Sequence, residues 1–402
     1  MSNPIIVCVL GMHRSGTSVI TRALNLCGVS LGPEEHLLRP AADNPKGFWE
    51  HQTFVALNDR ILNRMGGGAL EPPDFSSHWQ TLPALKDLRE AAQALIHREF
   101  CGETLWGWKD PRTCLTLPFW QQLLPGMRYV FCLRNPLDVA KSLQSRDGLS
   151  LARSIYLWFS YLRLPLIHTA GEQRLWICYE DLLSDCLREL VRIAHFLERP
   201  HLAERLEIRQ ALHDFLDTGL QHHRSETRSS IGNGSATAAA RALHLSWQVY
   251  LALQQQPSPA DGELLQQIDE GLSILHPDIL KERHAEEAKW RQQLQTVADH
   301  LSAVIPKGEK YIFVDEEQLG VSAPDRHPLP FLEKDGEYWG TPPDDDTAIR
   351  ELERLRRLGA RSLVVAWPAF WWLEYYSGWH HYLRAHFRCV LQNDRLIVFA
   401  LR

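Results

Sequence analysis

Two short polar segments, each placed directly after an apolar run, carry residue types that bind anions. The first covers residues 11–18 (Gly-Met-His-Arg-Ser-Gly-Thr-Ser) and follows the apolar run 5–10. A glycine-containing turn at a helix N-terminus presents backbone N–H groups and the positive end of the helix dipole. Together with the charge of Arg14, the segment predicts a site for phosphate or a similar oxyanion.

The spacing of this segment is close to that of the phosphate-binding loop G-x-x-x-x-G-K-[ST], but Thr17 stands in the lysine position. A kinase or nucleotide hydrolase built on it would therefore lack its main cation for the β- and γ-phosphates. Here the cation is Arg14, two residues before Gly16. A glycine turn that binds nothing is the plainer interpretation of the same residues.

The second segment covers residues 134–142 (Arg-Asn-Pro-Leu-Asp-Val-Ala-Lys-Ser) and follows the apolar run 129–133. Arg134 stands where open parallel sheets bind ligands, at the carboxyl end of a strand. Ser142 lies two helical turns further along and can face the same side. The pair predicts a second anion site, because a guanidinium offers a forked array of donors. A surface arginine and an unrelated helical serine are the alternative.

Both segments need a sheet that brings the ends of several strands together. The apolar runs at 5–10, 129–133 and 175–179 are typical of buried parallel strands. Helical patterns follow at 15–27 and after Asn135, which stands in a helix-capping position. Repeated strand–loop–helix units predict an α/β fold, with a P-loop-like parallel sheet flanked by helices.

Composition sets the class of protein. The chain has 402 residues, 45% of them hydrophobic, and its 43 Lys+Arg against 49 Asp+Glu give a net charge of −6. These values exclude a disordered or collagen-like chain and argue against a general nucleic-acid binder. Eight scattered cysteines without a C-x-x-C pair favour a reducing compartment. Without a signal-like N-terminus or an apolar stretch of roughly 20 residues, we expect a cytoplasmic protein with no membrane span.

Changes of pattern along the chain predict three regions. A main domain covers 1–285, a highly charged helical linker covers 286–305, and a small α/β module of unknown role covers 306–402. In the module, the dense aromatic run 367–376 is more typical of a core than of a platform for sugars. In the main domain, the small, polar and basic residues 219–240 predict a mobile loop.

The order and spacing of the motifs resemble the sulfotransferase family that uses 3′-phosphoadenosine 5′-phosphosulfate (PAPS). The family's first motif, P-K-S-G-T-T, is matched by residues 13–18. Its second motif runs from an arginine through R-x-P-x-D to a serine eight residues on, as from Arg134 to Ser142. A third feature, Tyr-Glu-Asp-Leu after a strand, stands at 179–182. The resemblance covers about residues 1–285.

This resemblance implies an enzyme that moves the sulfuryl group of PAPS to an acceptor hydroxyl by in-line displacement. The product of the donor would be 3′-phosphoadenosine 5′-phosphate (PAP), no metal would be needed, and the acceptor would be a glycan or another small hydroxylated molecule. The implied donor site has four parts: Arg14, Ser15, Gly16, Thr17 and Ser18 for the 5′-phosphosulfate, Arg134 and Ser142 for the 3′-phosphate, Tyr179 for the adenine, and Arg224 in a loop that closes over the nucleotide.

Four residues are candidates for the chemistry, which needs a base for the acceptor's proton and cations for the departing phosphate. The resemblance implies Glu50 as the base, Lys109 as a cation near the reacting centre and His51 as the rival base. Arg14 replaces the family's lysine, and it can only stabilise charge because arginine stays protonated. The plainer alternatives are that Glu50 caps a helix and that Lys109 pairs with Asp110.

Two functions of other classes stay open at this point. One is a P-loop kinase or nucleotide hydrolase, which the threonine at position 17 disfavours. The other is a non-catalytic anion-binding scaffold whose aromatic C-terminal part recruits a glycan. Nucleic acid is not expected as a partner of any of them, and the sequence leaves the oligomeric state open.

Overall fold

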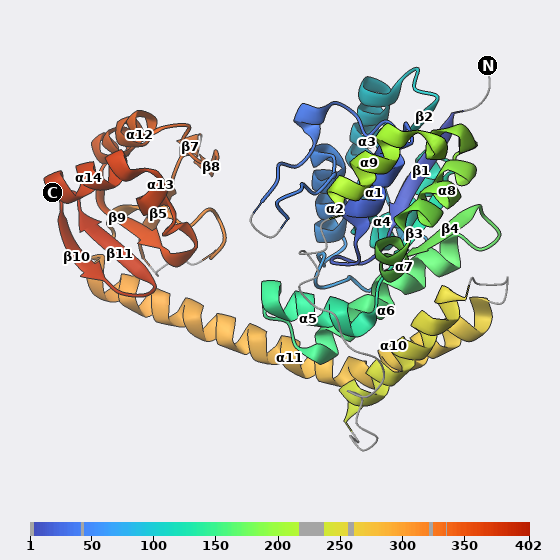
Figure 1. Ribbon diagram of the computed structural model, residues 1–402. Helices are drawn as coiled ribbons and strands as arrows, with labels where there is room; N and C mark the ends of the chain where they lie inside the picture. Colours follow the sequence, from blue (N-terminus) through green and yellow to red (C-terminus); the bar gives the residue numbers. More distant parts are fainter. Residues whose placement is uncertain (1–3, 42–43, 217–236, 256–260, 321–324, 335) are drawn as a thin grey trace. The chain divides into compact units, whose positions relative to one another are not determined.

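The computed structural model describes residues 4–402 except 42–43, 217–236, 256–260, 321–324 and 335. The chain divides into two compact units, residues 1–280 and 281–402, each with its own hydrophobic core (Figure 1). The predicted position of Arg224, together with most of the predicted loop 219–240, lies outside the described residues.

The first unit is built on a parallel sheet with the strand order β2-β1-β3-β4. Its strands are β1 (Ile5–Leu10), β2 (Leu105–Lys109), β3 (Arg128–Leu133) and β4 (Arg174–Cys178). All three pairings are parallel, and Val9 lies opposite Lys109 in the register. Both anion-binding motifs and the segment after β2 therefore meet at the carboxyl edge of the sheet, as the sequence predicts.

Alternation of side chains along these strands gives the sheet two buried faces. Val7 and Val9 belong to the core beneath helices α1, α8 and α9, whereas Cys8 and Leu10 belong to the core beneath α4, α5, α6 and α10. The helices of this unit are α1 (Thr17–Leu26), α2 (Gln52–Arg64), α3 (Lys86–Phe100), α4 (Thr113–Leu123), α5 (Pro136–Asp147), α6 (Leu151–His168), α7 (Tyr179–Ser184), α8 (Cys186–Phe196), α9 (Leu206–Phe215) and α10 (Ala238–Gln254). Short 3₁₀ turns cover Glu34–His36, Trp79–Thr81, Pro83–Leu85 and Pro200–Glu204.

The division between the two units falls within α11 (Asp261–Val304), a continuous helix of 44 residues. The highly charged sequence expected to link two domains lies inside this helix. The middle of the helix is highly charged and has few apolar side chains. Near its start, Leu264, Ile268 and Leu275 are buried in the core of the first unit. Its last turns carry Val297 and Leu301 into the core of the second unit.

The second unit contains a mixed sheet with the strand order β10-β11-β9-β5-β6. Strands β6, β5 and β9 are parallel to one another, and β9, β11 and β10 are antiparallel. Their bounds are β5 (Lys310–Val314), β6 (His327–Pro330), β9 (Ala360–Ala366), β10 (Arg388–Gln392) and β11 (Leu396–Ala400). A separate hairpin consists of β7 (Glu333–Lys334) and β8 (Glu337–Tyr338), and the helices are α12 (Asp345–Arg357), α13 (Trp372–Tyr375) and α14 (Ser377–His386), with a 3₁₀ turn at Trp367–Ala369.

The aromatic run 367–376 is core in part. Trp372 and Tyr376 are buried, Trp367 and Phe370 are half-buried, and Trp371 and Tyr375 are exposed. The expectation of a core run is thus met by two of its six rings, and Trp379, just beyond the run, is buried in the same core. Among the described residues, no helix combines the length and the apolar character that a membrane crossing requires.

Candidate active site

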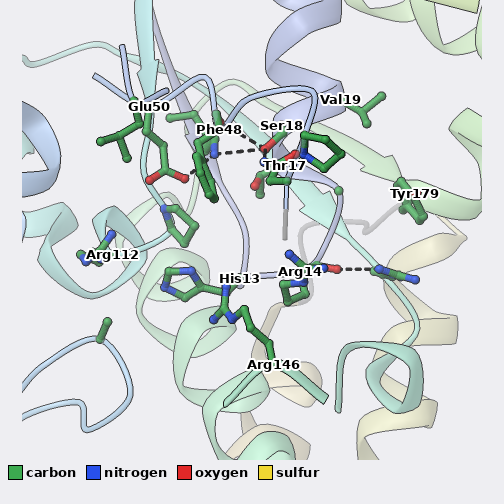
Figure 2. Close-up of a pocket in the computed structure, with 18 of the residues that line it drawn as sticks. His13, Arg14, Thr17, Ser18, Val19, Phe48, Glu50, Arg112, Arg146 and Tyr179 are labelled. Carbon is green, nitrogen blue, oxygen red and sulfur yellow. Dashed lines mark hydrogen bonds and ion pairs between the residues drawn. The ribbon is translucent and has the colours of Figure 1, made fainter. Parts of the chain in front are cut away.

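A cavity of about 480 Å³ opens at the carboxyl edge of the first sheet (Figure 2). Three parts of the chain form most of its wall: the turn between β1 and α1, the loop that precedes α2, and the residues that follow β2 and β3. Eight of the residues singled out in the sequence line it, namely Arg14, Gly16, Thr17, Ser18, Glu50, Lys109, Arg134 and Tyr179. Segments separated by more than 100 residues in sequence therefore share one site.

The turn between β1 and α1 is shaped by two left-handed residues, Arg14 (φ 67°) and Gly16 (φ 81°). Gly16 is the residue before the first turn of α1, so a helix N-terminus, whose first N–H groups have no partner within the helix, borders the cavity that Thr17 and Ser18 line. A Cβ atom on Gly16 would lie 2.2 Å from Cδ2 of Tyr179. Only glycine fits between the turn and this ring, and the arrangement is suited to an anion close to an aromatic side chain.

The two anion-binding motifs touch each other directly. Arg14 donates a hydrogen bond from Nε to Oγ of Ser142 (2.9 Å), and Arg134 donates from Nη1 to the backbone oxygen of Arg14 (2.9 Å). The guanidinium of Arg134 lies 4.7 Å from the ring centre of Tyr179, a cation–π contact. Two positive charges and one aromatic ring are thus fixed side by side along the cavity.

A buried ion pair lies on the other side of the turn. Nζ of Lys109 is 2.5 Å from Oε1 of Glu50 and 3.5 Å from Oγ of Ser18. Ser18 donates in turn to the backbone oxygen of Phe48 and accepts from Asn44 (both 3.2 Å). Burial raises the pKa of Glu50, while the adjacent ammonium of Lys109 favours the ionised carboxylate. The result is a carboxylate held at the cavity wall beside a cation.

Lys109 pairs with Glu50 rather than with its sequence neighbour Asp110. Asp110 instead accepts from Asn58 (2.8 Å) and from the guanidinium of Arg112 (3.0 Å), which also lies 2.6 Å from Asp59. This buried network fixes the turn between β2 and α4. It leaves the ammonium of Lys109 directed toward the cavity, and the alternative of a local Lys109–Asp110 pair does not describe this structure.

The two candidate bases occupy different surroundings. His51 is the residue that caps α2, since its Nδ1 accepts from the backbone N–H of Thr53 (3.2 Å), so Glu50 is not that cap. The ring of His51 is buried among aromatic side chains and does not line the cavity. Burial lowers its pKa, which keeps the ring neutral near pH 7. Of the two, only the carboxylate of Glu50 reaches the cavity.

His51 also belongs to a group that the spacing of the sequence does not reveal. His36, His51 and Glu99 each have one atom that could bind a metal ion, and these three atoms lie within 4.8 Å of one another. Glu99 is already bonded to His36 (3.1 Å), and the ring nitrogen Nδ1 of His51 is occupied by the helix cap. With Nδ1 accepting, the proton of the neutral ring sits on Nε2, which opposes metal binding there.

Three further ionisable residues line the cavity: His13, Arg112 and Arg146. Burial, and then the charges of the surrounding arginines and lysine, lower the pKa of His13 well below its ordinary value. The ring is therefore neutral, and its Nε2 finds no hydrogen-bond partner among the described residues. Arg112 could have been suspected from its place just after a strand, but nothing in the local pattern singles out His13 or Arg146.

Glu180 fixes the start of the second anion-binding motif, residues 134–142. Its carboxylate accepts from the backbone N–H of Asn135 (3.0 Å) and from the hydroxyl of Tyr250 on α10 (2.9 Å). Asn135 is the cap of α5, accepting from the N–H of Leu137 (2.9 Å). The turn that carries Arg134 is thus tied to α7 and α10.

Two of the predicted donor-site residues do not line the main cavity. Ser15 is buried and lines a separate cavity of about 20 Å³, and Ser142 reaches the main site only through its bond to Arg14. Arg224 lies outside the described residues. The remaining predicted donor-site residues converge on one cavity, as described above.

Comparison with known proteins defines the class of the chain. The family model described as "Sulfotransferase family" matches residues 4–204, half of the chain. The chain therefore belongs to the sulfotransferase family, and it is a sulfotransferase enzyme. The match contains both strand-end motifs, Glu50 and Lys109.

Solved structures give more distant likenesses. The chain is similar to sulfotransferase STF9 from Mycobacterium avium, with 15% identity, a TM-score of 0.33, and coverage of 56% of this chain and 69% of that one. It is also similar to the sulfotransferase domain of the Synechococcus PCC 7002 olefin synthase, with 19% identity, a TM-score of 0.34, and coverage of 62% and 96%. It is similar as well to the sulfotransferase domain of the curacin biosynthetic pathway, with 18% identity, a TM-score of 0.33, and coverage of 68% of this chain and 99% of that one. No curated protein matches the chain.

Proposed function

We propose that this sulfotransferase uses PAPS as its donor and moves the sulfuryl group to a hydroxyl of a glycan or another small hydroxylated acceptor, releasing PAP. One observation carries the proposal: the two cationic strand-end motifs and the buried Glu50–Lys109 pair line the same cavity. The two cationic motifs fit a donor that carries negative charge at both ends. The Glu50–Lys109 pair fits a reaction in which a proton is removed from the acceptor while negative charge grows on the leaving phosphate.

The donor would lie along the turn between β1 and α1. The backbone N–H groups at the start of α1, with Arg14, would bind the 5′-phosphosulfate. Arg134, together with Ser142, would bind the 3′-phosphate, and Tyr179 would contact the adenine. The hydrogen bond between Arg14 and Ser142 supports the assignment of both phosphate sites to one nucleotide.

Glu50 is the proposed base. It would take the proton of the acceptor hydroxyl as the acceptor oxygen forms its bond to sulfur. The bond between sulfur and the 5′-phosphate oxygen breaks, and its electron pair leaves on PAP. Arg14 and Lys109 would stabilise the charge that grows on the departing phosphate, because both line the cavity and approach the turn between β1 and α1 from its two sides.

Transfer of label from radioactive PAPS to pools of hydroxylated acceptors tests the proposal. We expect one pool to become labelled, and we expect Glu50→Gln to lower kcat by about a hundredfold to ten-thousandfold. A matched control is Glu35→Gln, because Glu35 is exposed and does not line the cavity. Labelled phosphate released from ATP with magnesium, and no labelled acceptor from PAPS, would support a nucleotide hydrolase instead.

A further inference from the structure

The second unit contains a cavity of its own that the sulfotransferase reaction does not use. It has a volume of about 340 Å³ and lies between helix α12 and the β7–β8 hairpin with the residues that flank it. Leu332 and Trp339 form its apolar wall, and its other lining residues are Glu333, Lys334, Thr347, Arg350, Glu351 and Arg354.

Trp339 gives this cavity a flat apolar surface. Trp339 is 67% exposed, although a tryptophan side chain has a large apolar surface whose burial is favourable. Its backbone is fixed, since the N–H of Trp339 donates to the oxygen of Leu332 (2.9 Å). Nζ of Lys334 lies 4.1 Å from the centre of the ring. An indole held in solvent at a cavity wall can stack against the C–H face of a sugar ring.

The charges around the cavity are not balanced. Arg354 is bonded to both carboxylates of the lining, those of Glu333 and Glu351, so these three groups form a closed network that fastens the hairpin to α12. Lys334 and Arg350 have no ion-pair partner among the described residues. Arg350 donates to the hydroxyl of Thr347 (2.8 Å), and its charge also acts on the exposed carboxylate of Asp344. Lys334 therefore places a positive charge on the exposed ring, and Arg350 brings a second one to the cavity wall.

We propose that this cavity binds an acidic saccharide, with a pyranose ring against Trp339 and its carboxylate or sulfate group between Lys334 and Arg350. The network of Arg354 with Glu333 and Glu351 offers donors and acceptors for sugar hydroxyls. The choice of a saccharide over another ring-bearing anion rests on the proposed function, because sulfation of a glycan produces an acidic saccharide. The module would then hold a glycan that the first unit has already sulfated.

Calorimetric titration of the full-length protein tests this inference with three tetrasaccharides: one sulfated, one carboxylated and one neutral. We expect at least one acidic tetrasaccharide to bind about tenfold or more tightly than the neutral one. Trp339→Ala should weaken the binding of the acidic ligand about tenfold or more, and Arg350→Ala should remove the preference for it. Trp371→Ala and Arg357→Ala are the controls, because both residues are exposed in the same unit but lie outside the cavity.

Three results would overturn the inference: no binding of either acidic tetrasaccharide at millimolar concentration, equal binding of the neutral one, or full affinity in Trp339→Ala. Binding that is lost in Lys109→Ala but kept in Trp339→Ala would place the saccharide in the first unit, and it too would reject the cavity. PAP titration of the same protein separates the two proposals. Failure to bind PAP would count against the proposed function. The saccharide titrations test only the cavity of the second unit, whatever the result with PAP.

Discussion

At the scale of single residues, the site depends on a carboxylate and an ammonium buried together. The side chains of Glu50 and Lys109 are 9% and 2% exposed, and burial of two charges is costly unless they are paired. Their pairing holds the carboxylate of Glu50, the proposed base, at the cavity wall. Arg14 cannot exchange a proton, so in this enzyme any proton transfer must use the other groups of the cavity.

With Glu50 as the proposed base, the pH dependence of the reaction follows from the ionisation of its carboxyl group. Burial raises its pKa, and the base must be deprotonated, so we expect kcat/KM to fall about tenfold per pH unit below that pKa. The acidic limb of the profile should therefore lie above the ordinary glutamate pKa of about 4.3. A profile of kcat/KM against pH measures it. If Glu50→Gln kept both the rate and the acidic limb, another group would be the base.

At the scale of elements, the site is set by where strands end and helices begin. Lys109 closes β2, Arg134 follows β3 and Gly16 precedes α1, so a parallel sheet is enough to bring them together. Glu180 adds a second layer of support, because it joins the cap of α5 to Tyr250 on α10. The proposed nucleotide site thus depends on α10, which lies far beyond the motif in the sequence.

Removal of the Tyr250 hydroxyl tests this support. Tyr250→Phe leaves the half-buried carboxylate of Glu180 with one partner fewer, so we expect a loss of about 1–3 kcal/mol in the free energy of unfolding. The turn that carries Arg134 should also loosen and weaken PAP binding. Urea unfolding and PAP titration measure the two effects, with the exposed Tyr375→Phe as control. A loss of stability with unchanged PAP affinity would mean that Glu180 supports the fold alone.

Much of the first unit could be predicted from the sequence because β1 and β3 are short apolar runs followed closely by glycine, or by asparagine and proline. Both anion-binding motifs and the cap at Asn135 follow from such local signals. The partners of Lys109 and Glu50 could not be predicted, because the choice between Asp110 and Glu50 depends on contacts with Asn58 and Arg112. In the second unit, β6 and β10 are partly exposed strands without a clear apolar pattern, and they were not predicted.

At the scale of the whole molecule, two units with separate cores share one chain. The first contains the proposed nucleotide site, and the second contains the cavity walled by Trp339. Separate cores allow separate unfolding transitions, and a ligand stabilises only the unit whose native state it binds.

Scanning calorimetry with and without PAP checks this division. We expect two transitions, of which PAP raises the midpoint of only one. Trp379→Ala leaves a cavity at a fully buried position of the second unit. We expect it to lower that unit's free energy of unfolding by about 3–5 kcal/mol, and with it the midpoint of the transition that PAP does not affect. A single transition that responds to both PAP and the substitution would show instead that the units unfold together.

The most direct measurement is the affinity of the wild-type protein and of Arg134→Ala for PAP and for adenosine 5′-phosphate. If Arg134 binds the 3′-phosphate, the wild-type protein prefers PAP by about tenfold to a hundredfold, as a charged hydrogen bond of about 1.5–3 kcal/mol provides. Arg134→Ala should then bind the two nucleotides almost equally. Equal affinities in the wild-type protein, or an unchanged preference in the variant, would contradict the account of the donor site.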